Sequence, residues 1–185
     1  MKNKNETKRI VTVAILISLS VIFSYFDNLI SHALFQTFRL IMPSFKIGLA
    51  NIAIIIFIMR FSVKDGLFAI ILKSLLVALM FTGVTGFMIG FPGTLLSFIV
   101  MTIFNKMFKS DKYIIFISAA GGLSHSLGQL LTAFAIYGIN QTETFLIYSP
   151  MILLVGLIAG CLVGVVGQKV VQLLDSYRII TKNND

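Results

Sequence analysis

A single cation, Lys73, stands inside an otherwise apolar stretch that runs from residue 66 to residue 81. The stretch has the composition of a transmembrane helix, and an ammonium group near the centre of a bilayer costs about 2.5 to 3.5 kcal/mol. Such residues nearly always face the interior of a helix bundle or a polar cavity. Lys73 therefore predicts a bundle that encloses a polar site, and its charge favours an anionic ligand there.

A second group of polar residues lies in the apolar segment around residue 125. His125 and Gln129 are four positions apart, so they share one face of a helix, and Ser118 and Gly122 continue that stripe. Ser, His and Gln side chains often serve only to hydrogen-bond a neighbouring helix, and for each residue alone this structural role is the commoner one. Considered together with Lys73, His125 and Gln129 favour a ligand site.

The composition of the chain identifies its class. Hydrophobic residues make up 57% of the 185 positions, charged residues only 12%, and the mean hydropathy is +0.97. These values exclude an ordinary soluble globular domain and indicate an integral membrane protein. The chain has one cysteine, Cys161, so neither an intrachain disulfide nor a multi-cysteine zinc site can form. We expect no metal and no cofactor.

The apolar residues fall into segments that are long enough to be membrane helices. A helix needs about 20 apolar residues to cross the hydrocarbon core, with a range of roughly 17 to 25. We therefore predict an all-α integral membrane protein that forms one domain over residues 1–185. Its six transmembrane helices are expected at about 9–27, 46–61, 65–82, 91–108, 113–138 and 145–171.

The positions of the basic residues predict the orientation of this bundle. Cytoplasmic loops carry an excess of Lys and Arg. With the N-terminus inside, the cytoplasmic side receives 12 of the 15 basic residues, namely Lys2, Lys4, Lys8, Arg9, Arg60, Lys64, Lys106, Lys109, Lys112, Lys169, Arg178 and Lys182. We expect both termini in the cytoplasm. Because topology accounts for the net charge of +8, no nucleic-acid partner is expected.

One long outer connection, residues 28–45, is apolar enough to fold back onto the bundle. It could act as a lid, or it could lie as an interfacial segment among lipid headgroups. Arg39 lies in this connection and Lys46 directly follows it, on the side where the predicted topology otherwise places almost no cations. Together with Lys73 they form a candidate anion-binding set.

Small residues recur at helical spacing in two of the segments. Gly156, Gly160 and Gly164 lie every four residues on one face, where they would allow two helix backbones to approach closely. Ala14 and Ser18 form a shorter small-xxx-small pair in the first segment. The glycine pattern predicts helix packing, and the significance of the Ala14 and Ser18 pair depends on the partner of the protein.

Three parts of the chain carry a resemblance to a known family. The run from Pro43 to Asn51, the cation Lys73 within a helix and the run from Ser124 to Gln129 resemble the signature of the Gx transporter family. Its members are often labelled heptaprenyl diphosphate synthase component I. This family is similar to the substrate-binding S-components of energy-coupling factor (ECF) transporters, and the resemblance covers nearly the whole chain.

The resemblance implies a fold, a location and a set of partners. It implies a six-helix bundle in a bacterial plasma membrane, with a binding site that opens outward beneath loops. Ala14 and Ser18 would dock on an ECF coupling membrane protein, which works with two ATP-binding subunits. Lys73, Lys46 and Arg39 would neutralise a small-molecule substrate, and His125, Gln129 and Asn51 would orient it by hydrogen bonds.

The acidic residues argue against enzymatic activity. A prenyl synthase needs clustered aspartates to hold magnesium against a diphosphate, and a proton-coupled transporter usually carries a carboxylate within the membrane. The seven acids are scattered singly, mostly at the ends of the predicted segments, namely Glu6, Asp27, Asp65, Asp111, Glu143, Asp175 and Asp185. The sequence also lacks a phosphate-binding loop for ATP.

These observations favour a non-enzymatic, S-component-like subunit that binds a small anionic solute for an ATP-driven importer. The alternative is an accessory membrane subunit in prenyl diphosphate or isoprenoid quinone synthesis, in which the same cations would bind a prenyl diphosphate. The two hypotheses predict different partners: ATP-binding subunits with a coupling membrane protein, or a soluble synthase that bears aspartate-rich motifs.

Overall fold

The described part of the chain is entirely helical. The structure is a computed structural model that describes residues 2–34, 36, 46–138 and 142–176, and these residues contain no strand. The elements are α1 (Lys2–Leu34), α3 (Asn51–Arg60), α4 (Val63–Val77), a π-helical turn (Ala78–Thr82), α5 (Gly83–Phe108), a 3-10 turn (Asp111–Tyr113), α6 (Ile114–Tyr137) and α7 (Thr142–Ser176). The predicted all-α class is confirmed.

The predicted number of membrane-crossing helices is not confirmed. Four described stretches are long and apolar enough to cross a membrane: Thr7–Ala33, Val63–Phe108, Asp111–Tyr137 and Thr142–Ser176. The second combines two of the predicted segments, because α4 continues through the π-helical turn into α5. The predicted helix at 46–61 is shorter than expected, since residues 46–50 are not helical and α3 has only 10 residues. Such a helix is about 15 Å long, roughly half the hydrocarbon thickness.

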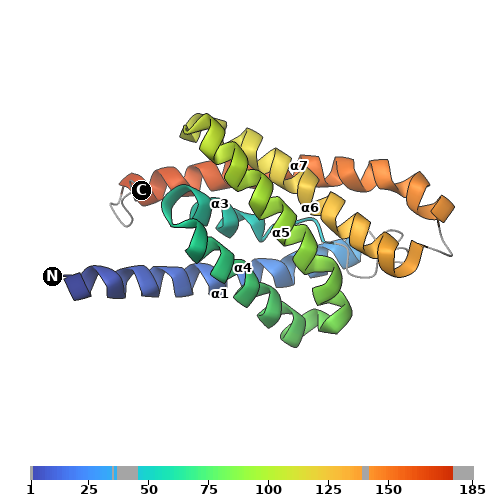
Figure 1. Ribbon diagram of the computed structural model, residues 1–185, viewed down its shortest axis with the longest axis horizontal. Helices are drawn as coiled ribbons and strands as arrows, with labels where there is room; N and C mark the ends of the chain where they lie inside the picture. The colour runs from blue at the N-terminus through green and yellow to red at the C-terminus, as the bar shows by residue number, and fades with distance from the viewer. Residues whose placement is uncertain (1, 35, 37–45, 139–141, 177–185) are drawn as a thin grey trace.

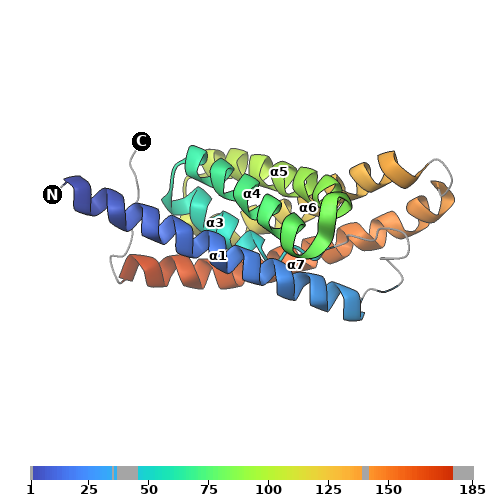
Figure 2. The same ribbon diagram turned by 90° about the horizontal axis from the view of Figure 1, so that it is seen from below.

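The helices α4 and α5 form a hairpin, and α6 and α7 pack beside it (Figures 1 and 2). The chain reverses direction near Gly83, whose positive φ of 65° is a conformation that favours glycine. At the start of α4, the Ser62 hydroxyl accepts a hydrogen bond from the Asp65 backbone, and the Asp65 carboxylate accepts one from the Ser62 backbone. This capping box fixes where α4 begins.

The short helix α3 lies at the centre of the bundle. It contacts α1, α4, α5, α6 and α7, and nine of its ten residues are buried. Its isoleucines, with Ile114 and Ile117 of α6, belong to the larger of two hydrophobic clusters. A short apolar helix that is buried on all sides is a core helix rather than a membrane span.

The glycine stripe in α7 has the predicted packing role. A Cβ at Gly156 would lie 2.0 Å from the Ser126 hydroxyl, and one at Gly160 would lie 2.6 Å from the backbone oxygen of Ser118, so α6 and α7 are in backbone contact there. The Ser118 hydroxyl donates a 2.6 Å hydrogen bond to the Gly160 carbonyl across this interface. The prediction that these small residues join two helices is confirmed.

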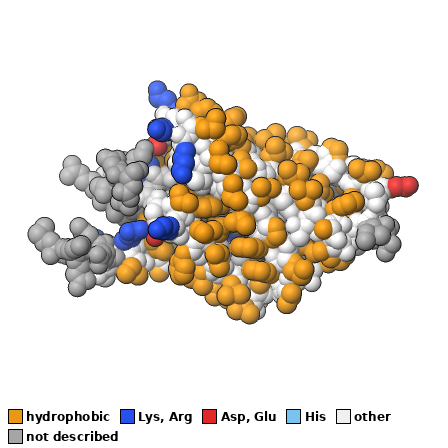
Figure 3. Space-filling view, in the orientation of Figure 1, with side chains coloured by type: hydrophobic (Ala, Val, Ile, Leu, Met, Phe, Trp, Pro, Cys, Tyr) orange, Lys and Arg blue, Asp and Glu red, His pale blue; other side chains and the backbone are white. Residues whose placement is uncertain are grey.

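The outer surface is mostly apolar and its charges are concentrated at one end. Figure 3 shows hydrophobic side chains over most of the visible face, and lysine and arginine side chains at the end where α1 begins and α7 ends. The junctions between α3 and α4 and between α5 and α6 carry Arg60, Lys64, Lys106, Lys109 and Lys112. These features indicate a multi-pass membrane protein. The side of the membrane on which this end lies stays a prediction.

Candidate functional site

A buried polar pocket lies between α1, the segment 46–50, α4, α5 and α6. The free space inside it is about 20 Å³, roughly that of one water molecule, so a solute enters only if side chains move. Four of the sequence-predicted site residues line it, namely Lys46, Asn51, Lys73 and His125. The fold therefore brings residues that are distant in the sequence to one pocket; Lys46 and Lys73, for example, are 27 positions apart.

The two lysines supply the positive charge of the pocket. Lys46 lies just before α3 and Lys73 lies in α4, and each side chain is only 9% exposed. Within the described residues no carboxylate lies within 4 Å of the Lys73 ammonium. Arg39, the third predicted cation, lies outside the described residues, so its role stays a prediction. The residues 28–45 proposed as a lid lie largely outside them as well; the described residues 28–34 continue α1.

The pocket also contains a carboxylate that the sequence analysis did not assign to the site. Asp27 of α1 is 2% exposed, and its two oxygens accept hydrogen bonds from the backbone N–H groups of Ile47 (2.8 Å), Gly48 (2.7 Å) and Leu49 (3.0 Å). Lys46 and Lys73 both interact electrostatically with it. Asp27 stands at the end of the predicted segment 9–27, but α1 continues seven residues beyond it to Leu34, so this acid lies within the helix rather than at its end.

The hydrogen bonds of Asp27 explain why the chain before α3 is not helical. Non-helical backbone within a membrane protein must find hydrogen-bond partners inside the protein. Asp27 supplies acceptors for three consecutive N–H groups, and this arrangement places Lys46 and Asn51 on either side of the bound segment. The sequence signal was the acid itself, in an apolar run, but its partners are backbone groups that no sequence pattern identifies.

His125 and Gln129 lie together, as their spacing predicts. The Nε2 of His125 and the Nε2 of Gln129 are 3.0 Å apart, and both side chains are buried. His125 lines the pocket, whereas Gln129 is fully buried behind it and accepts a 3.4 Å hydrogen bond from the Lys46 backbone. Gln129 thus contacts the pocket residues rather than the pocket space. Close packing of α5 at Gly93 holds it there, since a Cβ at Gly93 would lie 2.8 Å from the Gln129 Cγ.

Two polar atoms of the pocket residues lack a hydrogen-bond partner within the described part of the chain. They are the Oδ1 of Asn51 and the Nδ1 of His125, and both residues are 3% exposed. Buried polar groups in native proteins are nearly always hydrogen-bonded, because an unpaired one costs about 1 to 3 kcal/mol. Two such atoms in a pocket that also contains two lysines are typical of a site that a ligand completes.

The apolar side of the pocket is formed by Val77 of α4 and by Phe87 and Phe91 of α5. The two phenyl rings are stacked, with centroids 5.1 Å apart and planes inclined by 6°. A solute in this pocket would therefore meet both charged or polar groups and aromatic surface. Among the described residues, no three His, Cys, Asp or Glu side chains come together as a metal ion would require.

The predicted docking residues lie in a separate groove between α1 and α4. Ala14 and Ser18 are exposed, and the groove is completed by Ile17, Phe68 and Leu72, with Arg9 and Asp65 at one end. The Ser18 hydroxyl donates a hydrogen bond to the Ala14 carbonyl of its own helix, so its proton is already paired within α1. The pair therefore occupies an accessible, mainly apolar surface outside the pocket.

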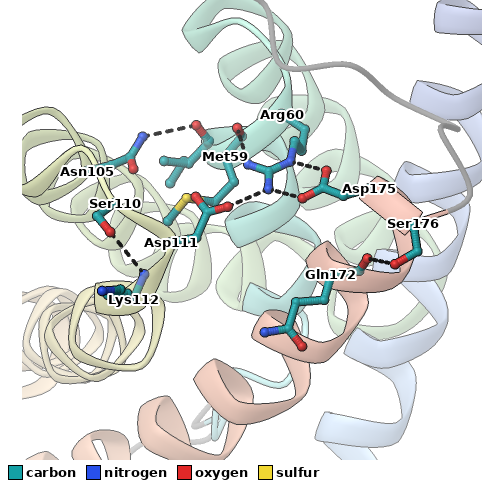
Figure 4. A network of polar contacts seen from close by, with 10 residues as sticks. Met59, Arg60, Asn105, Ser110, Asp111, Lys112, Gln172, Asp175 and Ser176 are labelled. Carbon is teal, nitrogen blue, oxygen red and sulfur yellow. Dashed lines mark hydrogen bonds and ion pairs between the residues drawn. The ribbon is translucent and has the colours of Figure 1, made fainter.

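An ion-pair cluster around the buried Arg60 side chain connects three elements at the basic end (Figure 4). The Arg60 guanidinium, at the end of α3, donates to Asp111 of the 3-10 turn at 2.6 Å and, through Nε, to Asp175 of α7 at 2.8 Å. Its side chain is 3% exposed, while those of Asp111 and Asp175 are 46% and 45% exposed. The cluster anchors the end of α3 opposite to the pocket.

The fold and the pocket together define a class: a multi-pass helical membrane protein with a buried pocket lined in part by lysines. The chain belongs to the heptaprenyl diphosphate synthase component I family, whose family model matches residues 10–170. This match confirms the family label that the sequence resemblance indicated. No curated protein and no solved structure shows a significant match to the chain.

Proposed function

We propose that this protein is the S-component-like, substrate-binding membrane subunit of an ATP-driven ECF importer in a bacterial plasma membrane. The observation that carries the proposal is the pocket at Lys46, Lys73, Asn51 and His125, in which two buried polar atoms have no well-formed hydrogen bond to the described residues. Such a site binds a solute and offers no clustered carboxylates for chemistry, so the subunit would have no catalytic role and no cofactor of its own.

The charges of the pocket support an anionic solute. Two lysines and one carboxylate line the pocket, and both lysines interact with that carboxylate, so the described lining has one more cation than anion. The excess positive charge is buried, where charge interactions are stronger than in water. Phe87 and Phe91 support an apolar part in the same solute, and the narrow pocket supports a small one.

The groove at Ala14 and Ser18 supports the expected partner. A membrane-embedded coupling protein would pack its helices against small, exposed residues on α1, as small-xxx-small pairs commonly permit. The two ATP-binding subunits would then supply the energy through that coupling protein.

The experiment that tests the proposal is purification of the tagged protein from its native cells in mild detergent, with mass spectrometry of the proteins and small molecules that accompany it. We expect a membrane coupling protein, two ATP-binding subunits and a small anion. A Lys73→Met variant should retain the protein partners and lose the small molecule. The importer assignment is wrong if neither ATP-binding subunits nor a coupling protein co-purify with the wild-type protein.

The second candidate is an accessory membrane subunit in prenyl diphosphate or isoprenoid quinone synthesis, and the family's own description favours it. In that case the lysines would bind the diphosphate, and the apolar groove between α1 and α4 would accommodate the prenyl chain. The same purification separates the two candidates, because this one requires a soluble synthase or a prenylated lipid to accompany the protein.

A further inference from the structure

The hydrogen bonds around Gln129 determine which atoms His125 can offer to a ligand. The Oε1 of Gln129 accepts from the Lys46 backbone N–H, so the Gln129 amide nitrogen is the atom that faces His125. An amide NH2 group is a donor only. The reversed amide would place this NH2 group against the Lys46 N–H, donor against donor.

The Nε2 of His125, 3.0 Å from that NH2 group, must therefore accept a hydrogen bond and carry no proton. A neutral imidazole with an unprotonated Nε2 carries its proton on Nδ1. This nitrogen is buried and has no partner that meets hydrogen-bond geometry among the described residues. The backbone of Gly93 also interacts with the ring, but no described group completes a well-formed hydrogen bond to Nδ1, so His125 presents an incompletely paired N–H donor in the wall of the pocket that also contains Lys73.

We propose that Gln129 is a specificity-determining positioning residue that fixes His125 as an Nδ1–H donor, so that His125 and Lys73 together select a ligand oxyanion, the carboxylate or phosphate group of a small solute. A donor and a cation side by side match an acceptor that carries negative charge. They disfavour a ligand that presents an N–H or hydroxyl donor at this point, because two donors would then face each other unpaired. The oxyanion part rests on the proposed function; the tautomer does not.

The segment bound by Asp27 takes part in this arrangement. Asp27 holds the N–H groups of residues 47–49, and this fixes the neighbouring Lys46 N–H that orients the Gln129 amide. Hydrogen bonds thus connect α1 to the segment before α3, and that segment in turn to α6. A change in Gln129 alters the ligand-facing atom of His125 without itself touching the pocket space.

Nitrogen-15 NMR of the full-length protein with labelled histidine measures the tautomer directly. The chain has only two histidines, His32 and His125, and the exposed His32 can be replaced by Gln to leave the signals of His125 alone. We expect a neutral ring with the proton on Nδ1. In Gln129→Glu, whose carboxylate only accepts, the proton should appear on Nε2; in Gln129→Met, both tautomers should be present.

Thr132→Val is the matched control on α6, since the Thr132 hydroxyl bonds only to the Gly128 carbonyl of its own helix. It should leave the His125 signals unchanged. The role of Gln129 is wrong if the wild-type ring carries its proton on Nε2 or on both nitrogens, or if Gln129→Glu and Gln129→Met both leave the spectrum unchanged.

The oxyanion part is tested on the same samples with sodium benzoate, inorganic phosphate and the neutral isostere benzamide. Benzoate or phosphate should shift the Nδ1 resonance of His125 in a saturable manner, benzamide should not, and Lys73→Met should abolish the shift. Equal shifts with benzamide, or none with either anion, would overturn the oxyanion assignment. Neither result depends on a transport partner, so failure here is distinguishable from failure of the importer proposal, which the co-purification decides.

Discussion

The Asp27 carboxylate accepts a hydrogen bond of 2.7 Å from the backbone N–H of Gly48, 21 residues later in the chain. This contact, with those to Ile47 and Leu49, joins the long first helix to the segment that precedes the central helix α3. Both Lys46 and Asn51 depend on it for their place in the pocket. A single side chain on α1 therefore organises one wall of the binding site.

Replacement of Asp27 by Ala should destabilise the protein, because it removes the acceptor for three N–H groups. Leaving even one of these groups buried and unpaired costs about 1 to 3 kcal/mol. Thermal unfolding in detergent measures the loss. Asp27→Asn keeps one acceptor oxygen and should be intermediate, whereas Asp27→Ala with unaltered stability would show that these bonds do not hold the segment.

Gly48→Ala should reduce ligand binding as well as stability. Gly48 has a φ of +100°, and an added Cβ would lie 3.1 Å from the Asn51 Nδ2 and 3.4 Å from the His125 Cδ2. Gly83→Ala is the matched control, since Gly83 also has a positive φ but an added Cβ there meets nothing within 4 Å. Both variants should lower the unfolding temperature, and only Gly48→Ala should lower the amount of co-purified small molecule. Equal ligand recovery from the two variants would contradict this prediction.

Lys73→Met should weaken ligand binding by about 30-fold or more, which corresponds to about 2 kcal/mol for loss of a buried charge partner. Titration of the purified protein with the solute identified by mass spectrometry measures the effect. Because the variant also relieves the cost of a buried ammonium, its stability in detergent should be unchanged or higher. Lys106→Met, at the basic end and outside the pocket, should leave the affinity unaltered.

Arg60→Met should destabilise the basic end by about 1 to 2 kcal/mol. This is less than the roughly 3 to 5 kcal/mol found for fully buried pairs, since Asp111 and Asp175 are almost half exposed. Arg9→Met is the control, because the Arg9 pair with Asp65 lies at the same end but Arg9 is 47% exposed. Hydrogen exchange of α3 and of the last turns of α7 should increase in Arg60→Met alone. Similar hydrogen exchange in both variants would show that the ion pairs of Arg60 do not stabilise this end more than the exposed pair of Arg9 does.

Larger side chains at Ala14 and Ser18 should separate the protein from its membrane partner. The double variant Ala14→Leu, Ser18→Leu fills the exposed groove between α1 and α4 without touching the pocket. We expect loss of the coupling protein and the ATP-binding subunits from the purification, with retention of the small molecule. The control is Ile15→Leu, on the exposed surface beside the groove but not among its lining residues. Retention of all partners by the double variant would place the docking surface elsewhere.

The sequence identified the pocket through residues whose polarity conflicts with their surroundings. Lys73 and His125 stand out because each is polar within an apolar helix, and the four-residue spacing of His125 and Gln129 predicted their contact. Asp27 was missed because it stood at the predicted end of its segment, where an acid is usually solvated. Its actual role depends on the backbone of residues 47–49, and hydrophobic periodicity carries no signal for such contacts.

Two boundaries of the predicted helices differ from those in the structure. Residues 46–50 were predicted to be helical, but the N–H groups of residues 47–49 bond to Asp27 and that of Lys46 bonds to Gln129 instead of to the preceding turn. The predicted segments 65–82 and 91–108 left a connection between them, but the chain reverses near Gly83 while remaining helical on both sides. The first conformation depends on tertiary partners, whereas the second depends on a glycine with a positive φ.

The half-length of α3 has a consequence for how the protein is made. A segment of 10 residues cannot stay in a bilayer as an independent span, and the non-helical residues before it would expose N–H groups to lipid. During synthesis, α3 can therefore become stable only after α1 has presented Asp27 and the hairpin of α4 and α5 has enclosed it. We therefore expect α3 to reach its final position only after the helices that follow it in the chain have been synthesised.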